Sequence, residues 1–192
     1  MVTVGIDEVG RGCWAGPLVA AAVAMEQSIP GLRDSKKLSA KQRQKLDAEI
    51  RSQVKSIGVG WVTPGEIDTL GMTKSVQLAM LRAVKQIVGT YDEVIIDGNI
   101  QYFKNVVGLK TNNVVAVVGA DGTVPAVSAA SIVAKVARDQ YMVEQAALFP
   151  GYAFEKNVGY GTAAHIAALQ QIGICPLHRT SFKPIKPFII SS

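Results

Sequence analysis

Acidic residues lie at or just after the end of three strand-like segments of this chain, and this pattern constrains the fold more than any other feature. The alternating segment 2–6 is followed at once by two acids, the apolar segment 93–98 ends on a third, and the run 114–118 precedes a fourth. In chain order, the four acids are Asp7, Glu8, Asp97 and Asp121. Sheets covered by helices bind ligands beyond their strand ends, at one edge. We therefore expect these acids to gather at one edge of a sheet.

Four carboxylates at one edge repel one another strongly unless a cation lies between them. Mg²⁺, a hard cation with oxygen ligands, suits a site that has few protein ligands and a substrate phosphate. A single acid of this kind is more simply explained as a loop residue that caps a backbone amide, but three such strand ends favour a metal site. Neighbouring side chains on a regular strand point to opposite faces, so Asp7 and Glu8 are expected to share the site only if the chain leaves strand geometry between them.

The remaining pattern predicts a mixed sheet flanked by helices. Further strands are expected at 17–25 and 57–62, and helices at 39–50, 64–88, 125–149 and 162–172. Ser39 and Gln42 have the spacing of a capping box at the start of the first helix. Strands come first and then alternate with helices, which is typical of an α/β architecture.

Composition narrows the class of protein. With 192 residues, 48% of them hydrophobic, the chain is long enough for one globular domain with a real core. No apolar run approaches the ~18 residues of a membrane helix, and the N-terminus lacks a signal-peptide layout, so we expect a cytoplasmic protein with no membrane contact. Cys13 and Cys175 form no CxxC or Cys/His cluster, which predicts free thiols and no zinc site.

The net charge of +5 is concentrated in one segment. Residues 33–55 contain eight basic and three acidic side chains, and this difference of five equals the net charge of the whole chain. A concentrated basic face suggests a polyanionic partner. On this feature alone, a solvated helix surface is the simpler explanation.

A glycine-rich turn around Arg11 follows the first acids. Gly10, Gly12 and Gly16 are expected to leave backbone amides uncovered, so that a sugar-phosphate chain can approach the main chain. Other side chains fit phosphate or sugar contacts. These are Ser35, Lys36 and Lys37 before a helix start, Lys135 and Arg138 one helical turn apart, Tyr160 between two glycines, and the cluster His178, Arg179, Ser181 and Lys183. Without further context, Tyr160 is equally well explained as a ring that covers the core.

Six blocks of the sequence together resemble the bacterial type 2 ribonucleases H (ribonuclease HII). In order, the blocks are GIDEVGRGCWAGP, LRDSKKLS, VIIDGN, GADGTVPAVSAASIVAKVARD, GYGTAAH and HRTSF. The likeness runs from Val4 to Pro184, and six blocks in register are specific although each one alone is weak. The resemblance implies an α/β, RNase H-like fold with a five-stranded mixed sheet flanked by helices. It also implies a single catalytic domain over 1–192, with 150–192 as a small helical C-terminal extension.

The resemblance implies a metal-dependent endoribonuclease. Such an enzyme cleaves the RNA strand of RNA–DNA hybrids and incises duplex DNA on the 5′ side of single ribonucleotides, leaving 3′-OH and 5′-phosphate ends. Its two Mg²⁺ or Mn²⁺ ions would be held by the catalytic acids Asp7, Glu8, Asp97 and Asp121. The G-R-G turn (Gly10, Arg11 and Gly12) would grip the 2′-OH, a contact that distinguishes RNA from DNA. Tyr160 would pack against a deoxyribose, and Asn99 of the VIIDGN block would be a further substrate contact.

The sequence departs from the family pattern near the fourth acid. Basic residues usually lie two positions before and two after it, where this chain has Gly119 and Thr123. We expect a weaker grip on phosphate or a shifted metal preference there. The expected partners are RNA–DNA hybrid and ribonucleotide-containing duplex DNA, the expected state is a monomer, and no sliding-clamp-binding tail is recognised after Phe188.

Two other functions remain open at this point. The missing basic flanks are compatible with a non-catalytic module that binds hybrids with salt-sensitive affinity. A different nuclease of the same fold, such as a resolvase or an integrase-like enzyme, would instead cut an all-DNA duplex. A type 3 ribonuclease H is disfavoured, since no extra N-terminal domain precedes the first strand.

Overall fold

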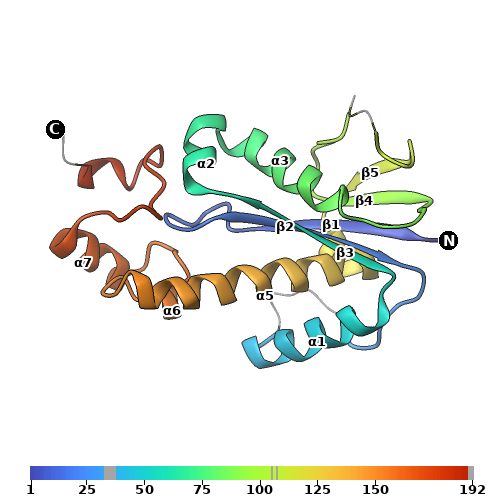
Figure 1. The fold of residues 1–192 in the computed structure, drawn as a ribbon, viewed down its shortest axis with the longest axis horizontal. Coiled ribbons are helices and arrows are strands. Elements are labelled where there is room, and N and C mark those ends of the chain that lie inside the picture. Colours follow the sequence, from blue (N-terminus) through green and yellow to red (C-terminus); the bar gives the residue numbers. More distant parts are fainter. Residues whose placement is uncertain (33–37, 105, 107, 190–192) are drawn as a thin grey trace.

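The computed structural model describes residues 1–32, 38–104, 106 and 108–189. Its centre is a five-stranded sheet in the order β3-β2-β1-β4-β5 (Figure 1). The strands are β1 (Thr3–Val9), β2 (Leu18–Met25), β3 (Ser56–Val62), β4 (Glu93–Asp97) and β5 (Val114–Val117). Strands β1, β2 and β3 pair antiparallel, whereas β1, β4 and β5 pair parallel. The expected five-stranded mixed sheet is therefore confirmed.

Eight helical segments accompany the sheet in the described part of the chain. They are α1 (Ala40–Gln53), α2 (Pro64–Leu70), α3 (Met72–Val84), α4 (Ala120–Thr123), α5 (Pro125–Leu148), α6 (Phe154–Asn157), α7 (Ala163–Ile172) and a short 3₁₀ helix (Lys186–Phe188). The capping box of α1 is present, with both reciprocal bonds between Ser39 and Gln42. The single helix predicted over 64–88 is wrong, because Gly71, at φ +73°, ends α2 and begins α3. None of the helices described is long and apolar enough to cross a membrane.

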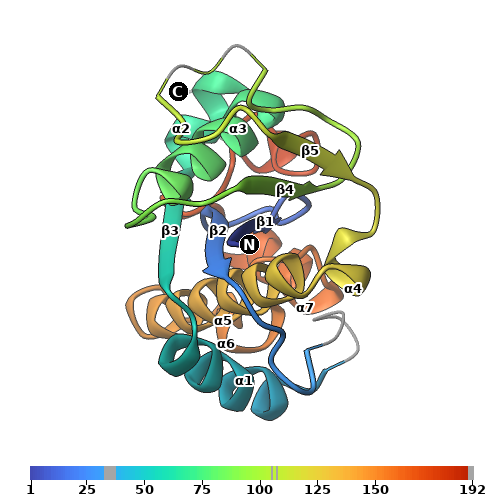
Figure 2. The same ribbon diagram turned by 90° about the vertical axis from the view of Figure 1, so that its right-hand side faces the viewer.

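Helices cover both faces of the sheet (Figure 2). Strand β2 is buried along its whole length, which explains its continuous apolar sequence. Alternate residues such as Ala20 and Ala22 belong to the core on the α3 side, and Ala21 and Val23 belong to the core on the α5 side. Helix α5 approaches β1 so closely that a Cβ on Gly5 would lie 2.1 Å from a main-chain carbon of α5. Helix α1 lies outside α5.

The described part of the predicted C-terminal extension packs at the end of β1. In Figure 1, α6, α7 and the last segment gather beside the turn that follows this strand. Main-chain hydrogen bonds join the two regions, from Gly16 N–H to the Leu177 carbonyl (2.8 Å) and from Arg179 N–H to the Trp14 carbonyl (2.9 Å). A third hydrophobic cluster, which contains Phe154, fills the space between them. The extension therefore supports the turn rather than standing apart from it.

Candidate active site

The parallel strands bring the acids to one edge of the sheet. Because β1, β4 and β5 run in the same direction, their carboxyl ends lie together. Asp7 and Glu8 lie near the end of β1, Asp97 is the last residue of β4, and Asp121 lies in α4, directly after β5. The main-chain N–H of Asp121 donates to Oδ1 of Asp97 (3.4 Å).

Three of the acids line one cavity of about 270 Å³. Asp7, Glu8 and Asp97 face it, while Asp121 is held beside it through Asp97. The other lining residues are Val9, Arg11, Arg43, Ser131, Lys135 and Tyr160. The cavity thus combines carboxylates with cationic groups and one exposed aromatic ring.

Asp7 and Glu8 share the cavity without leaving the strand. From the sequence, we expected the two acids to share a site only if the chain left strand geometry between them. Instead, β1 continues to Val9 and stays paired with β2 throughout. Pairing with β4 instead stops at Ile6. Both acids line the cavity at this end of β1, where the side of the strand toward β4 is unpaired.

Burial sets the charge state of these acids. Asp7 is only 7% exposed, and burial is the main cause that raises its pKa to about 7. A hydrogen bond from Ser131 opposes this rise, while the charges of Glu8 and Asp97 add to it. Burial also raises the pKa of Glu8, although Arg11 donates to its Oε1 (3.0 Å) and opposes the shift.

The donor set fits a hard divalent cation. All four candidate ligands are carboxylates, which suits Mg²⁺ or Mn²⁺ better than zinc. Across the described ranges, no three His, Cys, Asp or Glu side chains are close enough to enclose a metal ion as they stand. A cation bound between the carboxylates would offset their mutual repulsion.

The glycine-rich turn is less bare than its sequence predicts. Gly10, at φ +96°, packs against Arg138, so that a Cβ there would lie 2.5 Å from the Arg138 Nε. Gly16 packs against Met142 in the same manner. Only Gly12 of the three glycines is open, with no other atom within 4 Å of a Cβ built on it. The main chain accessible to a ligand is therefore that around Arg11 and Gly12.

Two predicted phosphate contacts are instead buried and donate hydrogen bonds to main-chain carbonyls. Arg138 and Arg179 are both 0% exposed. The Arg138 guanidinium donates to the carbonyls of Pro17 (2.9 Å), Val158 (2.9 Å) and Ala15 (3.1 Å). The Arg179 guanidinium donates to the carbonyls of Gly16 and Arg11. Loop carbonyls buried at this depth need donors, and the two arginines supply them. We therefore omit both residues from the proposed substrate contacts.

The other members of the predicted C-terminal cluster differ in burial. His178 is 2% exposed and pairs with the ring of His165. Burial lowers the pKa of His178 to about 4, so it is a neutral side chain rather than a phosphate-binding cation. Ser181 donates its N–H and hydroxyl to Oδ1 of Asp68. Lys183 is exposed.

The other predicted contacts differ in position. Lys135 lines the acidic cavity, with its ammonium 2.8 Å from Asp139 and 6.0 Å from the centre of the Tyr160 ring. Tyr160 is 40% exposed and lines the same cavity, so it is not a core tyrosine. Asn99 is exposed and lies outside the cavity lining. Ser35, Lys36 and Lys37 lie outside the described residues.

Two polar residues that line the cavity were not predicted individually as site residues. Arg43 extends from α1, where the sequence revealed only a basic helix, and it donates to the Leu38 carbonyl (2.6 Å). Ser131 lies on α5 and hydrogen-bonds Asp7. Its only sequence signal was its place within the GADGTVPAVSAASIVAKVARD block.

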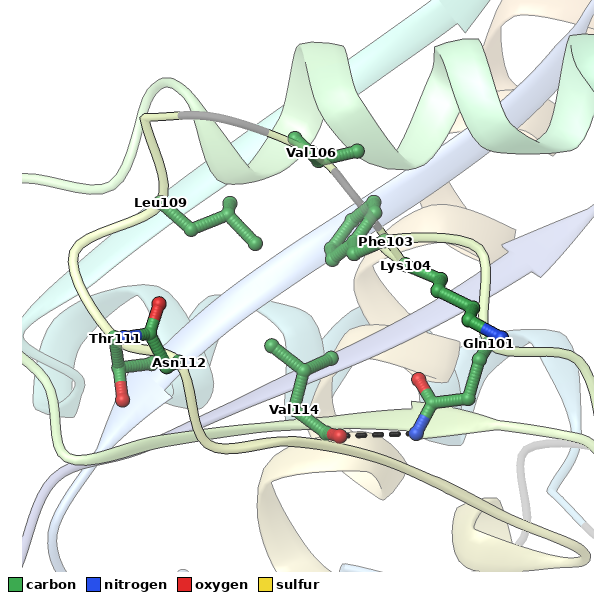
Figure 3. A pocket seen from close by; sticks show the side chains of 8 residues that line it. All are labelled: Gln101, Phe103, Lys104, Val106, Leu109, Thr111, Asn112 and Val114. Atoms are coloured by element: carbon green, nitrogen blue, oxygen red, sulfur yellow. Dashed lines mark hydrogen bonds between the residues drawn. The ribbon is translucent and has the colours of Figure 1, made fainter.

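A second cavity, of about 390 Å³, lies beside β5 (Figure 3). Phe103, Leu109 and Val114 point toward one another in it, and the Gln101 side chain donates to the Val114 carbonyl (2.9 Å). Among the residues described, none of the four acids lines this cavity. The acidic cavity is therefore the candidate active site.

Comparison with known proteins identifies the family of this chain. The family model described as Ribonuclease HII matches residues 4–185. Ribonuclease HII of Halorhodospira halophila is 45% identical over 185 residues, 95% of this chain and 92% of the relative. Ribonuclease H2 from Pyrococcus horikoshii superimposes with a TM-score of 0.83 at 26% identity, over 98% of this chain and 97% of that one. Ribonuclease HII of Archaeoglobus fulgidus, solved as a complex with PCNA, gives 0.77 at 28% identity, over 95% and 96%. The RNase H-like fold expected from the sequence is confirmed, and the chain belongs to the ribonuclease HII family.

Proposed function

We propose that this ribonuclease H hydrolyses the RNA strand of RNA–DNA hybrids and incises duplex DNA on the 5′ side of single ribonucleotides, leaving 3′-OH and 5′-phosphate ends. Membership of the ribonuclease HII family supports action on RNA in hybrids. The observation that carries the finer proposal is the cavity in which Asp7, Glu8 and Asp97 meet Arg11 and Tyr160. Carboxylates for the chemistry and groups suited to a sugar thus face one space.

The acids are proposed to hold two divalent cations. Asp7, Glu8, Asp97 and Asp121 would bind Mg²⁺ or Mn²⁺, which when bound supply an activated water and stabilise the leaving 3′-oxygen. The carboxylates would hold the cations at the sheet edge, where a phosphate can approach them, and the neighbouring N–H of Asp121 orients Asp97. No side-chain nucleophile is needed for such a reaction.

Recognition of the ribonucleotide is assigned to the turn and to Tyr160. The open main chain at Gly12 allows close approach of a 2′-OH, and Arg11 is anchored by Glu8 beside it. The exposed ring of Tyr160 offers an apolar face to a deoxyribose. Lys135 and Arg43, which line the same cavity, are suited to neighbouring phosphates. Ser35, Lys36, Lys37 and Asn99 remain predicted contacts.

The test is incubation of the protein with three matched duplexes and Mg²⁺ or Mn²⁺. The duplexes are all-DNA, DNA with one ribonucleotide, and an RNA–DNA hybrid. We expect incision of the second on the 5′ side of the ribonucleotide, cleavage of the RNA strand in the third, and no cleavage of the first. Cleavage of the all-DNA duplex would indicate another nuclease of this fold. Salt-sensitive binding without any cleavage under either metal would indicate a binding module.

Substitution of the acids assigns the chemistry to this cavity. Asp97→Asn is expected to lower the turnover number by orders of magnitude while the protein stays folded. Glu26→Gln is the matched control, because Glu26 is an exposed acid whose partner is Lys55, outside the cavity lining. A near-normal rate for Asp97→Asn would remove this residue from the proposed site.

A further inference from the structure

The two histidines of this chain form a buried pair outside the acidic cavity. His165 is the third residue of α7, and His178 lies in the turn that follows this helix. They are 0% and 2% exposed, and their Nε2 atoms are 3.0 Å apart. At this distance one ring donates a hydrogen bond and the other accepts it. The proposed function gives neither residue a role.

The carbonyl of Tyr160 determines which nitrogen of His165 carries the proton. This oxygen accepts from the main-chain N–H of Thr162 (2.8 Å) and lies 2.9 Å from the Nδ1 of His165. A carbonyl oxygen can only accept, so this Nδ1 is protonated. In a neutral imidazole the other nitrogen, Nε2, is then an acceptor.

The tautomer of His178 follows from that of His165. Since Nε2 of His165 accepts, Nε2 of His178 donates. The Nδ1 of His178 lies 2.9 Å from the N–H of Cys175 and 3.1 Å from the Cys175 carbonyl. Because Nε2 of neutral His178 carries the proton, its Nδ1 accepts from the Cys175 N–H, and the Cys175 carbonyl accepts from the main-chain N–H of His178 instead (3.0 Å). A single directed chain of hydrogen bonds results, from Cys175 N–H through His178 and His165 to the carbonyl of Tyr160.

The surroundings favour the neutral pair. The rings of Trp14, Tyr152 and Phe154 pack around the two imidazoles, with centroid distances from 5.0 to 6.2 Å. Burial among these groups lowers the pKa of both histidines. Each ring nitrogen therefore has a partner of the correct kind in the uncharged state.

The chain of bonds ends at the residue that faces the substrate. On the N-terminal side of Tyr160, Gly159 is fixed by its carbonyl, which accepts from the N–H of Trp14 (2.8 Å). On the C-terminal side, the Tyr160 carbonyl is fixed by Thr162 and His165. The histidine pair thus connects the peptide that carries the Tyr160 ring to the C-terminal turn at Cys175.

We propose that His165 and His178 are positioning residues for Tyr160, and that as one neutral donor–acceptor relay they hold its ring at the sugar-binding side of the cavity. This inference rests on the proposed function, because that function gives Tyr160 its contact with the deoxyribose. The relay itself is a property of the folded chain without substrate.

The relay is tested first without any activity. In the wild-type protein labelled with ¹⁵N-histidine, two-bond ¹H–¹⁵N spectra at pH 7 identify which nitrogens are protonated. We expect His165 to be protonated at Nδ1 only and His178 at Nε2 only. The opposite tautomer in either ring, or a doubly protonated His178, would overturn the proposal, whether or not the protein cuts a duplex.

Kinetics test the positioning role. The Asn amide nitrogen takes a place close to imidazole Nδ1, so His165→Asn keeps a donor for the Tyr160 carbonyl, whereas His165→Leu removes it. With a duplex that contains one ribonucleotide, His165→Leu is expected to raise KM about tenfold, the value of one hydrogen bond at the upper end of its usual range, with kcat little changed. His165→Asn is expected to recover most of the loss.

The Tyr160→Ala background separates positioning from general damage to the fold. There, His165→Asn and His165→Leu are expected to have equal KM values, because the ring that they position is absent. Equal KM values of His165→Asn and His165→Leu when Tyr160 is intact would contradict the proposal. A difference between the two variants that persists after Tyr160→Ala would also contradict it. If His165→Leu does not fold, the KM of His165→Asn compared with that of the wild type, together with the tautomer spectra, still tests the proposal. A wild-type protein that incises no duplex would refute the proposed function, while the spectra would still test the relay.

Discussion

The buried guanidinium of Arg138 is expected to contribute more to stability than to substrate binding, and Arg138→Met tests this. The side chain extends from α5 under the glycine-rich turn and donates to the carbonyls of Pro17, Val158 and Ala15. Methionine fills a similar volume but donates no hydrogen bond. The substitution leaves these three carbonyls without the donor that joins the turn to the Tyr160 region.

The magnitude follows from these bonds. Leaving one buried polar group unsatisfied costs about 1–3 kcal/mol, and three carbonyls at the lower limit give about 3 kcal/mol. Removal of a buried cation recovers part of its desolvation penalty, so we expect a loss near this lower limit. Lys55→Met is the matched control, because Lys55 and Glu26 form an ion pair whose two side chains are both exposed, and such a pair is worth about 0.5 kcal/mol or less.

Urea unfolding followed by tryptophan fluorescence measures both variants. Arg138→Met should lower the free energy of unfolding by about 3 kcal/mol, while Lys55→Met should leave it within about 0.5 kcal/mol of wild type. The reasoning is refuted if Arg138→Met unfolds at the wild-type urea concentration and instead raises KM for the duplex. That result would place Arg138 on the substrate, as the sequence pattern suggested.

Three further predictions concern pH, packing and charge. Burial lowers the pKa of His178 from 6.5 to about 4, so between these values the unfolded chain binds the proton more readily than the folded one. The contribution of His178 to stability should therefore be complete above pH 6.5 and fall by about 2–3 kcal/mol as the pH drops toward 4, whereas the raised pKa of Asp7 acts in the opposite direction. The difference in unfolding free energy between wild type and His178→Gln isolates the His178 contribution in urea titrations at several pH values, and a difference that does not change with pH would argue against it. Gly5→Ala should destabilise the protein by about 3 kcal/mol in thermal unfolding, because its Cβ would lie 2.1 Å from a main-chain carbon of α5. Gly65→Ala, with nothing within 4 Å of its Cβ, should cost nothing, and equal effects at both positions would contradict this packing. Thr123 is exposed on α4, and Thr123→Lys should lower KM and steepen the salt dependence of binding by about one unit of slope; unchanged values would mean that the missing basic flank is of no consequence.

Local sequence rules predicted most of the sheet and the edge that carries the acids. Alternation and apolar runs located the strands, whereas the parallel pairing of β1, β4 and β5 is seen only in the structure. The break at Gly71 was missed because the apolar spacing that indicated a helix begins only at Met72 and gives no information on the residues before it.

The roles of single polar residues were harder to predict, because a sequence does not show how deeply a side chain is buried. Lys135 and Arg138 are three residues apart on α5, yet one lines the cavity and the other is buried beneath the turn. Gly10 resembles an open phosphate-binding glycine but is instead the place where Arg138 fits. His178 lies in a polar segment of the sequence and packs among aromatic rings. Tertiary packing decides each of these cases.

The central claim is that Asp7, Glu8, Asp97 and Asp121 bind divalent cations together. Calorimetric titration of Mn²⁺ into the wild-type protein, the single Asn variants of Asp7 and Asp97, and the surface control Glu26→Gln measures this directly. The account predicts tight binding to wild type and to the control, and an affinity reduced roughly tenfold or more in both Asn variants, because each removes a charged oxygen ligand. Equal Mn²⁺ affinity in all four proteins would contradict it.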